Sequence, residues 1–231
     1  MEIKLERIEH MKSLDEYKLV IWDLDGTLYF QKEFRLKMAM VLICKLIFTP
    51  KHWKDVLVIL KYRNLREKWN AADTEAELEK RQYIETGKSF RMSGEQVQGI
   101  IEHWMLEEPL RYLKAYRDEN AVRIIEELQQ KGIKTIVYSD YPTKDKLKAL
   151  DIQILESYAA TDKEIGCMKP NPKGLEYIVN KYQIPKKDII MIGDRMEKDG
   201  EVAKAVGIDY LILARKRKQR NLQYKDGIGI L

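Results

Sequence analysis

The chain has 231 residues, of which 45% are hydrophobic and 34% charged, and its 42 basic and 37 acidic side chains leave a formal net charge of +5. These proportions, with few glycines and prolines, exclude disordered and collagen-like chains and indicate one large domain or a domain with a sizeable insertion. So small an excess of positive charge does not predict nucleic acid as a partner.

The two cysteines, Cys44 and Cys167, lie far apart in the sequence and fit neither a disulfide framework nor a zinc site. This usage is typical of a protein in a reducing compartment. The first 17 residues alternate charged residues with single apolar ones and lack the continuous apolar stretch of a signal peptide. We therefore expect a cytoplasmic protein.

Residues 18–24, KLVIWDL, predict a buried strand that runs into a tight loop. Residues 31–116 then show helical spacing and no convincing strand, and about four helices fit there. Residues 74–77 and 93–96 have the S/T-x-x-E/Q spacing that satisfies free backbone N–H groups at the start of a helix.

The most lipophilic segment, residues 38–48 (MAMVLICKLIF), is interrupted by Lys45 and is much shorter than the roughly 20 residues that span a bilayer. We therefore expect no membrane span and predict that this segment forms a buried helix. Membrane contact and a dimer interface are the alternatives, and the oligomeric state stays open.

After Asp118 helical and strand patterns alternate, which is typical of parallel βαβ units. Gly132 and Gly207 predict helix ends, and Asn171 before Pro172 predicts a helix start. The expected helices cover residues 119–131, 143–150, 172–183 and 201–206, and the expected strands cover residues 133–139, 158–161, 188–194 and 208–213.

These patterns predict an α/β fold in which a Rossmann-like parallel sheet is interrupted after its first strand by an all-helical cap. We place the core at residues 1–30 and 116–231 and the cap at residues 31–115. Ligands of open parallel sheets bind outside the carboxyl ends of the strands. Polar residues gather at those expected ends and in one loop beside them: Asp23, Asp25, Thr27, Ser139, Asp140, Lys169, Asp194 and Asp199.

Carboxylates brought together at one edge of a sheet repel one another, so they either raise a pKa or require a cation. Mg²⁺ suits oxygen-rich sites and shares its coordination with phosphate. Lys169 and Ser139 would then supply positive charge and a hydrogen bond to phosphoryl oxygens. These are the groups that phosphoryl transfer needs, because its catalysis is largely positioning and electrostatic stabilisation.

The motif Asp23-Leu24-Asp25-Gly26-Thr27-Leu28 resembles the first motif of the haloacid dehalogenase (HAD) superfamily. Three further motifs follow in the family's order: Ser139, then Lys169-Pro170, then Gly193-Asp194 with Asp199. The helical insertion is similar in position to the cap of the phosphoglycolate-phosphatase-like branch.

The resemblance implies that Asp23 is the nucleophile and that Asp25 is the general acid and later the general base. It also implies a Mg²⁺ ion held by the carboxylates of Asp23 and Asp194 and the backbone carbonyl of Asp25, with Asp199 as a second or water-mediated ligand. Thr27, Ser139 and Lys169 would bind phosphate. Glu197 could replace or assist Asp199.

An aspartate at position 25 implies phosphate esters as substrates, since the family's dehalogenases need no acid there. We therefore predict a Mg²⁺-dependent phosphatase for a small phosphorylated metabolite. The alternatives are a sugar phosphomutase, a non-enzymatic relative and a nucleic-acid end-phosphatase that uses the basic run Arg215 to Arg220. We expect that run to be a solvated tail, because charge runs of this kind are usually solvated.

Overall fold

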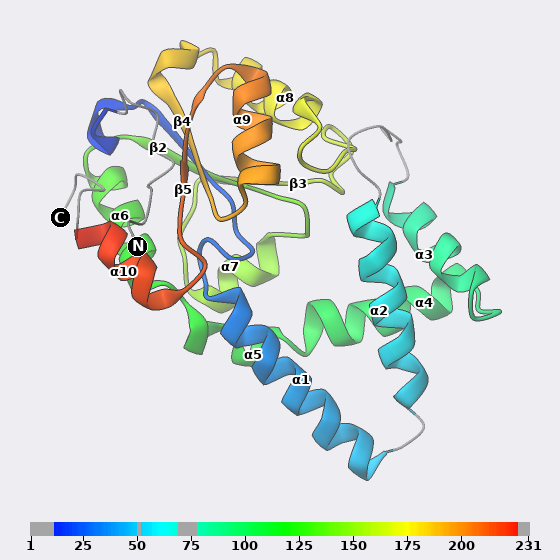
Figure 1. The fold of residues 1–231 in the computed structure, drawn as a ribbon. Helices are drawn as coiled ribbons and strands as arrows, with labels where there is room; N and C mark the ends of the chain where they lie inside the picture. The colour runs from blue at the N-terminus through cyan, green and yellow to red at the C-terminus, as the bar shows by residue number, and fades with distance from the viewer. Residues whose placement is uncertain (1–11, 50–51, 69–77, 226–231) are drawn as a thin grey trace.

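A five-stranded parallel sheet forms the centre of the protein (Figure 1), whose computed structural model describes residues 12–49, 52–68 and 78–225. The strands lie in the order β3-β2-β1-β4-β5, so that β1 is central between β2 and β4. The connections run to opposite sides of β1, and such a reversal is where open parallel sheets bind ligands. The strands are β1 (Leu19–Trp22), β2 (Lys134–Ser139), β3 (Glu156–Ala159), β4 (Ile189–Gly193) and β5 (Asp209–Ile212).

Helices cover both faces of the sheet, which is why the central strand is buried throughout. Successive side chains of a strand point to opposite faces, so Leu19 and Ile21 join one core cluster while Val20 and Trp22 join the other. The helices of this region are α6 (Glu119–Gln130), α7 (Lys144–Leu150), α8 (Pro172–Tyr182), α9 (Glu201–Val206) and α10 (Arg217–Lys225).

A helical unit lies between β1 and α6, at the end of the sheet where the strands finish (Figure 1). It consists of α1 (Gln31–Phe48), α2 (Trp53–Lys68), α3 (Leu78–Lys88), α4 (Gly94–Ile101), a π-helical stretch (Glu102–Glu107) and α5 (Leu110–Leu113). It has an apolar cluster of its own, formed by Val58, Tyr62, Tyr83, Val97 and Ile101. The chain leaves and re-enters the sheet region side by side, because Tyr29 and Arg117 form an antiparallel bridge. The division at residues 31–115 stays a prediction, and it falls beside this bridge.

Local sequence signals mark several helix ends correctly. Ser93 caps α4 by accepting a hydrogen bond from the Gln96 N–H, and the Gln96 side chain accepts one from the Ser93 N–H. Asn171 caps α8 ahead of Pro172. Gly207 ends α9 with φ of 78°, in the left-handed region that favours glycine. The capping signal at residues 74–77 lies outside the described residues.

The prediction of a buried helix over residues 38–48 is wrong. These residues form the larger part of α1, but the buried residue of that helix is Phe34, in its first turn. Ile47 and Phe48 are 70% and 86% exposed. The later turns of α1 extend beyond the sheet towards the tip of a hairpin with α2 (Figure 1), so little of the protein covers their outer face. Among the described residues, no helix combines the length and hydropathy needed to cross a bilayer.

Candidate active site

Three of the predicted polar residues lie at the carboxyl ends of three neighbouring strands. Asp23 directly follows β1, and its N–H donates a 2.8 Å hydrogen bond to the carbonyl of Ile192 in β4. Asp194 directly follows β4, and Ser139 is the last residue of β2. The parallel register pairs Trp22 with Ile192, so the residues that follow them start from the same edge of the sheet.

Three buried carboxylates, Asp23, Asp194 and Asp199, form an acidic cluster in which one oxygen of each lies within 4.8 Å of the others. Lys169 faces this cluster, with Nζ 2.6 Å from Oδ1 of Asp23 and 2.6 Å from Oδ1 of Asp199. Burial lowers the pKa of Lys169, but these two carboxylates outweigh burial and raise the pKa well above its ordinary value. Lys169 is therefore held as an ammonium ion at the site.

The acidic cluster has more negative charge than Lys169 neutralises. Burial and the charge of Asp199 raise the pKa of Asp194 to about 6. Burial also raises the pKa of Asp23, because the attraction of Lys169 does not compensate for it. Oδ1 of Asp194 is buried with no hydrogen-bond partner among the described residues. A hard divalent cation would satisfy this oxygen and the excess charge, so the cluster fits the Mg²⁺ ion that the sequence predicts.

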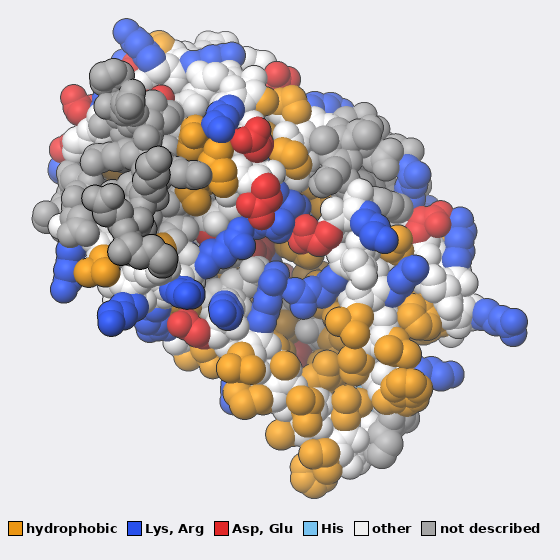
Figure 2. Space-filling view, in the orientation of Figure 1, with side chains coloured by type: hydrophobic (Ala, Val, Ile, Leu, Met, Phe, Trp, Pro, Cys, Tyr) orange, Lys and Arg blue, Asp and Glu red, His pale blue; other side chains and the backbone are white. Residues whose placement is uncertain are grey.

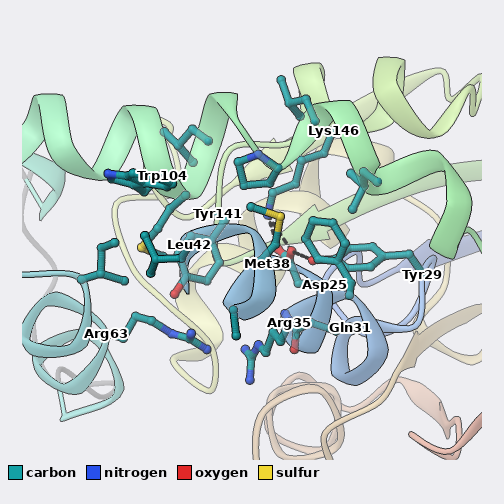
Figure 3. A pocket seen from close by; sticks show the side chains of 18 of the residues that line it. Asp25, Tyr29, Gln31, Arg35, Met38, Leu42, Arg63, Trp104, Tyr141 and Lys146 are labelled. Atoms are coloured by element: carbon teal, nitrogen blue, oxygen red, sulfur yellow. Dashed lines mark hydrogen bonds and ion pairs between the residues drawn. The ribbon is translucent and has the colours of Figure 1, made fainter. Parts of the chain in front are cut away.

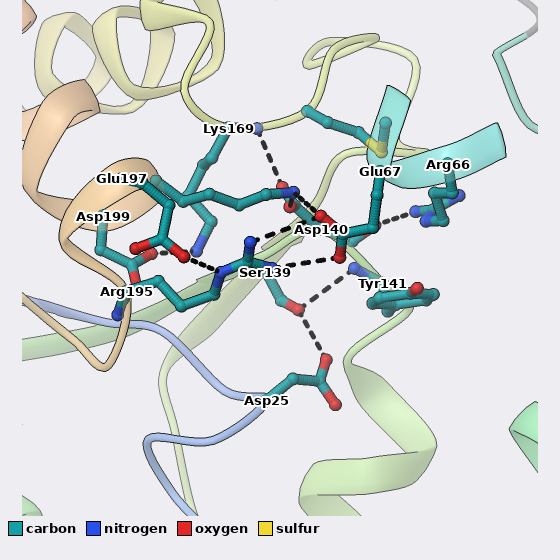
Figure 4. A network of polar contacts seen from close by, with 12 residues as sticks. Asp25, Arg66, Glu67, Ser139, Asp140, Tyr141, Lys169, Arg195, Glu197 and Asp199 are labelled. Atoms are coloured by element: carbon teal, nitrogen blue, oxygen red, sulfur yellow. Dashed lines mark hydrogen bonds and ion pairs between the residues drawn. The ribbon is translucent and has the colours of Figure 1, made fainter. Parts of the chain in front are cut away.

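Asp25 lies outside the acidic cluster, and three donors hold its carboxylate. Lys146 Nζ lies 2.6 and 2.8 Å from its two oxygens, and Tyr29 donates a 2.5 Å hydrogen bond (Figure 3). Ser139 donates a third hydrogen bond, of 3.2 Å (Figure 4). Burial raises the pKa of Asp25, but the charge of Lys146 and these hydrogen bonds lower it further than burial raises it. The expected bond from the Asp25 backbone carbonyl to Mg²⁺ stays a prediction.

Lys146 is not among the residues predicted from the sequence. One signal could have found it: Lys146 lies in the first turn of α7, the helix that follows the strand ending at Ser139. The first turn of such a helix lies near the carboxyl edge of a parallel sheet, so its charged residues are candidates for contact with the site.

Two residues that the sequence predicts to bind phosphate contact the two aspartates of the first motif. The Thr27 hydroxyl, which is fully buried, donates a 2.9 Å hydrogen bond to Oδ2 of Asp23. Ser139 Oγ accepts a 3.1 Å hydrogen bond from the Tyr141 N–H and donates to Asp25. Gly26, with φ of 106°, lets the loop approach the cluster, since a Cβ there would lie 2.6 Å from Oδ2 of Asp194.

The basic run Arg215 to Arg220 is only partly the solvated tail that the sequence predicts, because residues 215–218 are exposed but Arg220 is not. It enters α10, and the side chain of Arg220 is fully buried. The guanidinium of Arg220 donates hydrogen bonds to the carbonyls of Gly26 and Thr27 at 2.6 and 2.9 Å. Arg215 Nε lies 3.2 Å from Oδ2 of Asp194. The expectation fails for Arg215 and Arg220, because these arginines bind carbonyls and a carboxylate that are distant in the sequence.

Asp140 links the loops around the site. It accepts a 2.9 Å hydrogen bond from the Lys169 N–H, and its other oxygen lies 2.8 Å from Lys198 Nζ (Figure 4). Arg66 of α2 is buried and donates a hydrogen bond to the Asp140 carbonyl. The helical unit is thereby attached to the residue that follows Ser139.

Glu197 lies away from the acidic cluster. It is exposed and pairs with Arg195 at 3.0 Å (Figure 4). Oδ2 of Asp199, in contrast, accepts hydrogen bonds from the N–H groups of Asp194 and Arg195. The geometry therefore favours Asp199 over Glu197 as the second acidic residue of the fourth motif.

Known proteins share this architecture. The family model of haloacid dehalogenase-like hydrolases matches residues 17–207. The HAD-hydrolase YfnB from Bacillus subtilis, in a structure bound to magnesium, superimposes with a TM-score of 0.61 at 15% identity, covering 91% of this chain and 99% of that chain. The 2-haloacid dehalogenase from Pseudomonas syringae pv. Tomato DC3000 gives a TM-score of 0.60 at 16% identity, covering 85% and 86% of the two chains.

A protein described as a phosphatase from Clostridium difficile gives a TM-score of 0.54 at 17% identity, covering 90% of this chain and 91% of that chain. The search of curated proteins by sequence found no match. Identities this low establish the fold alone, so the choice between phosphatase and dehalogenase chemistry depends on the residues of the site.

Proposed function

Because the chain belongs to the haloacid dehalogenase-like hydrolases, we propose that it is a cytoplasmic, Mg²⁺-dependent phosphatase that hydrolyses an organic phosphomonoester through an aspartyl-phosphate intermediate. One observation carries this proposal: the two carboxylates of the first motif lie in different environments. Asp23 belongs to the acidic cluster with Lys169, while Asp25 is bound by Lys146, Tyr29 and Ser139. Two carboxylates in different environments can take different roles, here nucleophile for Asp23 and general acid and base for Asp25.

In the first step a carboxylate oxygen of Asp23 attacks phosphorus, and the bond from phosphorus to the alcohol oxygen breaks. Asp25 gives its proton to that oxygen, and the alcohol leaves. In the second step Asp25 takes a proton from water, whose oxygen attacks phosphorus and releases inorganic phosphate and free Asp23. A difficult displacement is thus divided into two easier ones.

The chain's own residues favour these steps by position and charge. Thr27 orients the Asp23 carboxylate, and the Lys169 ammonium lies where negative charge of the phosphoryl group would develop. A Mg²⁺ ion held by Asp23, Asp194 and Asp199 would neutralise further charge on the phosphoryl oxygens. The lowered pKa of Asp25 keeps its carboxylate ionised, and the ionised form is the one that accepts a proton in the second step. A bound phosphate dianion would raise that pKa, since like charges disfavour ionisation, and so favour the acid form for the first step.

The alternatives differ in how much the site supports them. Asp25 argues against dehalogenase chemistry, because a haloacid has no leaving alkoxide to protonate. The end-phosphatase has less support than the sequence suggested, since Arg215 and Arg220 of its basic run contact Asp194 and the Gly26 loop. A phosphomutase uses the same nucleophile and would return the phosphoryl group to the substrate.

The purified protein should release phosphate from p-nitrophenyl phosphate or acetyl phosphate with Mg²⁺ and stop when EDTA is added. Asp23→Asn should abolish turnover, while the exposed Glu197→Gln should retain it. Full activity of Asp23→Asn would contradict the nucleophile assignment. Formation of glucose 6-phosphate from glucose 1-phosphate without phosphate release would favour the mutase, and no turnover of any phosphate ester would favour a non-enzymatic relative.

A further inference from the structure

An apolar cavity of about 310 Å³ opens beside Asp25, within the helical unit (Figure 3). Met38 and Leu42 of α1, Ile59 of α2, and Trp104 line it. Its polar lining lies at the end near the site, where Arg35, Arg63, Tyr141 and Lys146 are found along with Asp25. A leaving group bound here would meet mostly hydrocarbon and aromatic surface, which a sugar or another polyol does not complement.

The outer surface of the same helices is also apolar. We define the tip face as Met40, Ile43, Ile47, Phe48, Trp53 and Leu60, all of which are exposed. Leu60 is 57% exposed and also lines the cavity, so the tip face and the cavity are continuous. Adjoining apolar side chains at the end of a projecting hairpin mark an interaction surface rather than scattered surface residues.

A band of positive charge borders this apolar surface. Lys32, Arg35, Lys216, Arg217 and Lys218 line one groove. Glu33 also lines it and lies 3.5 Å from Arg217, so the basic residues are in excess. Leu36 on the same groove leads along α1 to the tip face. Figure 2 shows the orange apolar side chains gathered at the lower end, blue Lys and Arg side chains above them, and a hollow between the two. Apolar surface next to basic surface complements a bilayer that has anionic headgroups above its hydrocarbon.

We propose that the tip face and the basic band dock on an anionic lipid surface, and that the cavity receives the apolar chain of a phosphomonoester drawn from that surface. The docking surface goes beyond the proposed function. The substrate class rests on the proposed function. This substrate is larger and more apolar than the small metabolite expected from the sequence. The apolar chain of the substrate would enter the cavity along Leu60. Its phosphate would pass Asp25 and reach Asp23 and Lys169.

A second copy of the chain is a poorer occupant of this surface. In a two-fold dimer the same patch meets itself, so the basic band would face apolar side chains or the other basic band instead of negative charge. A hairpin tip is also convex (Figure 1), and a convex tip inserts into a bilayer more readily than it forms a broad interface with an identical tip.

Vesicle flotation tests docking without any need for catalysis. The full-length protein should float with vesicles of phosphatidylcholine and phosphatidylserine, and less with phosphatidylcholine alone or at high salt. The tip variant, Ile47→Ser combined with Phe48→Ser, should bind the vesicles at least tenfold more weakly, because burial of large apolar side chains supplies the insertion energy. Lys216→Glu combined with Lys218→Glu should weaken it at least tenfold at low salt.

Matched controls come from the amino ends of the strands, at the end of the sheet away from the site. Leu155, 68% exposed, lies just before β3 begins, and Lys186 and Lys187 lie just before β4 begins. Leu155→Ser, and Lys186→Glu with Lys187→Glu, should float like the unaltered protein. Absence of flotation of the unaltered protein, or equal flotation of the tip variant, would overturn the proposal. So would a dimer in sedimentation that the tip variant dissociates.

Turnover tests the substrate class separately. With dodecyl phosphate in anionic vesicles, the tip variant should lose at least fivefold in turnover while it retains the turnover of soluble p-nitrophenyl phosphate. Turnover of p-nitrophenyl phosphate together with rejection of dodecyl phosphate would overturn the substrate class alone. If neither ester is hydrolysed, the proposed function fails, while flotation still decides whether the surface docks on lipid.

Discussion

The guanidinium of Arg220 donates a 2.6 Å hydrogen bond to the carbonyl of Gly26, a residue 194 positions earlier in the chain. The same side chain binds the Thr27 carbonyl and the Asp118 carboxylate, and Tyr224 of the same helix also donates to Asp118. The loop that carries Asp23 and Asp25 is therefore fixed from behind by α10. Arg220 touches neither aspartate, so we regard it as a positioning residue.

Arg220→Met should lower the free energy of unfolding by about 3 kcal/mol, because it leaves Asp118 buried without its charged partner. Lys218→Met, on the exposed side of the same helix, should change it by no more than about 0.5 kcal/mol. Chemical denaturation measures both. Equal stability of the two variants would mean that α10 behaves as the solvated tail that the sequence suggested.

Lys146→Met should lower kcat about 10- to 100-fold, because Asp25 loses the ammonium that orients it and a small misplacement of a catalytic group is costly. KM for p-nitrophenyl phosphate should change less, and Lys146→Arg should recover part of the rate. Lys144→Met, exposed at the start of the same helix, is the control. An unchanged kcat in Lys146→Met would contradict a positioning role for this lysine.

Much of the fold could be predicted because its signals are local. The strand around Val20 is a continuous apolar run, and helix starts at Ser93 and Asn171 depend on side chains within three residues of the backbone they cap. Asp23 and Asp194, which come together in the site, follow from one topological rule about strand ends, and Lys169 joins them from a loop beside those ends.

The features that the sequence did not reveal depend on distant contacts. Several basic residues lie close together in α10, and only tertiary contact with Gly26 and Asp118 distinguishes Arg220 from its exposed neighbours. Lys146 is one of three lysines in α7, and the orientation of the helix selects it. The exposure of residues 38–48 could not be predicted from their hydropathy, because it depends on whether other parts of the protein pack over them.

Removal of metal should be detectable without any substrate. Mg²⁺ at about one hundred times its Kd should stabilise the fold by about 2.7 kcal/mol and raise the Tm by about 5 to 10 °C. Asp194→Asn should abolish this shift, because it removes a member of the acidic cluster. Glu197→Gln should retain the shift, since Glu197 is exposed and pairs with Arg195. Loss of the shift in both variants would instead place Glu197 among the ligands. Thermal melts with Mg²⁺ and with EDTA provide the measurement.

The buried carboxylate of Asp140 should make stability depend on pH in a defined range. Burial raises its pKa, but Lys169 and Lys198 lower it below the ordinary value of 3.8. A group whose pKa is lower in the folded state stabilises the protein above the unfolded pKa, and this contribution is lost as the pH falls through the folded pKa. Asp140→Asn should therefore cost about 3 kcal/mol at pH 7, and the difference from the unaltered protein should shrink below about pH 4. Urea unfolding of both proteins between pH 7 and pH 3 measures it, with the exposed Asp145→Asn as control. A difference that stays constant over this range would show that Asp140 acts through its hydrogen bonds and not through its charge.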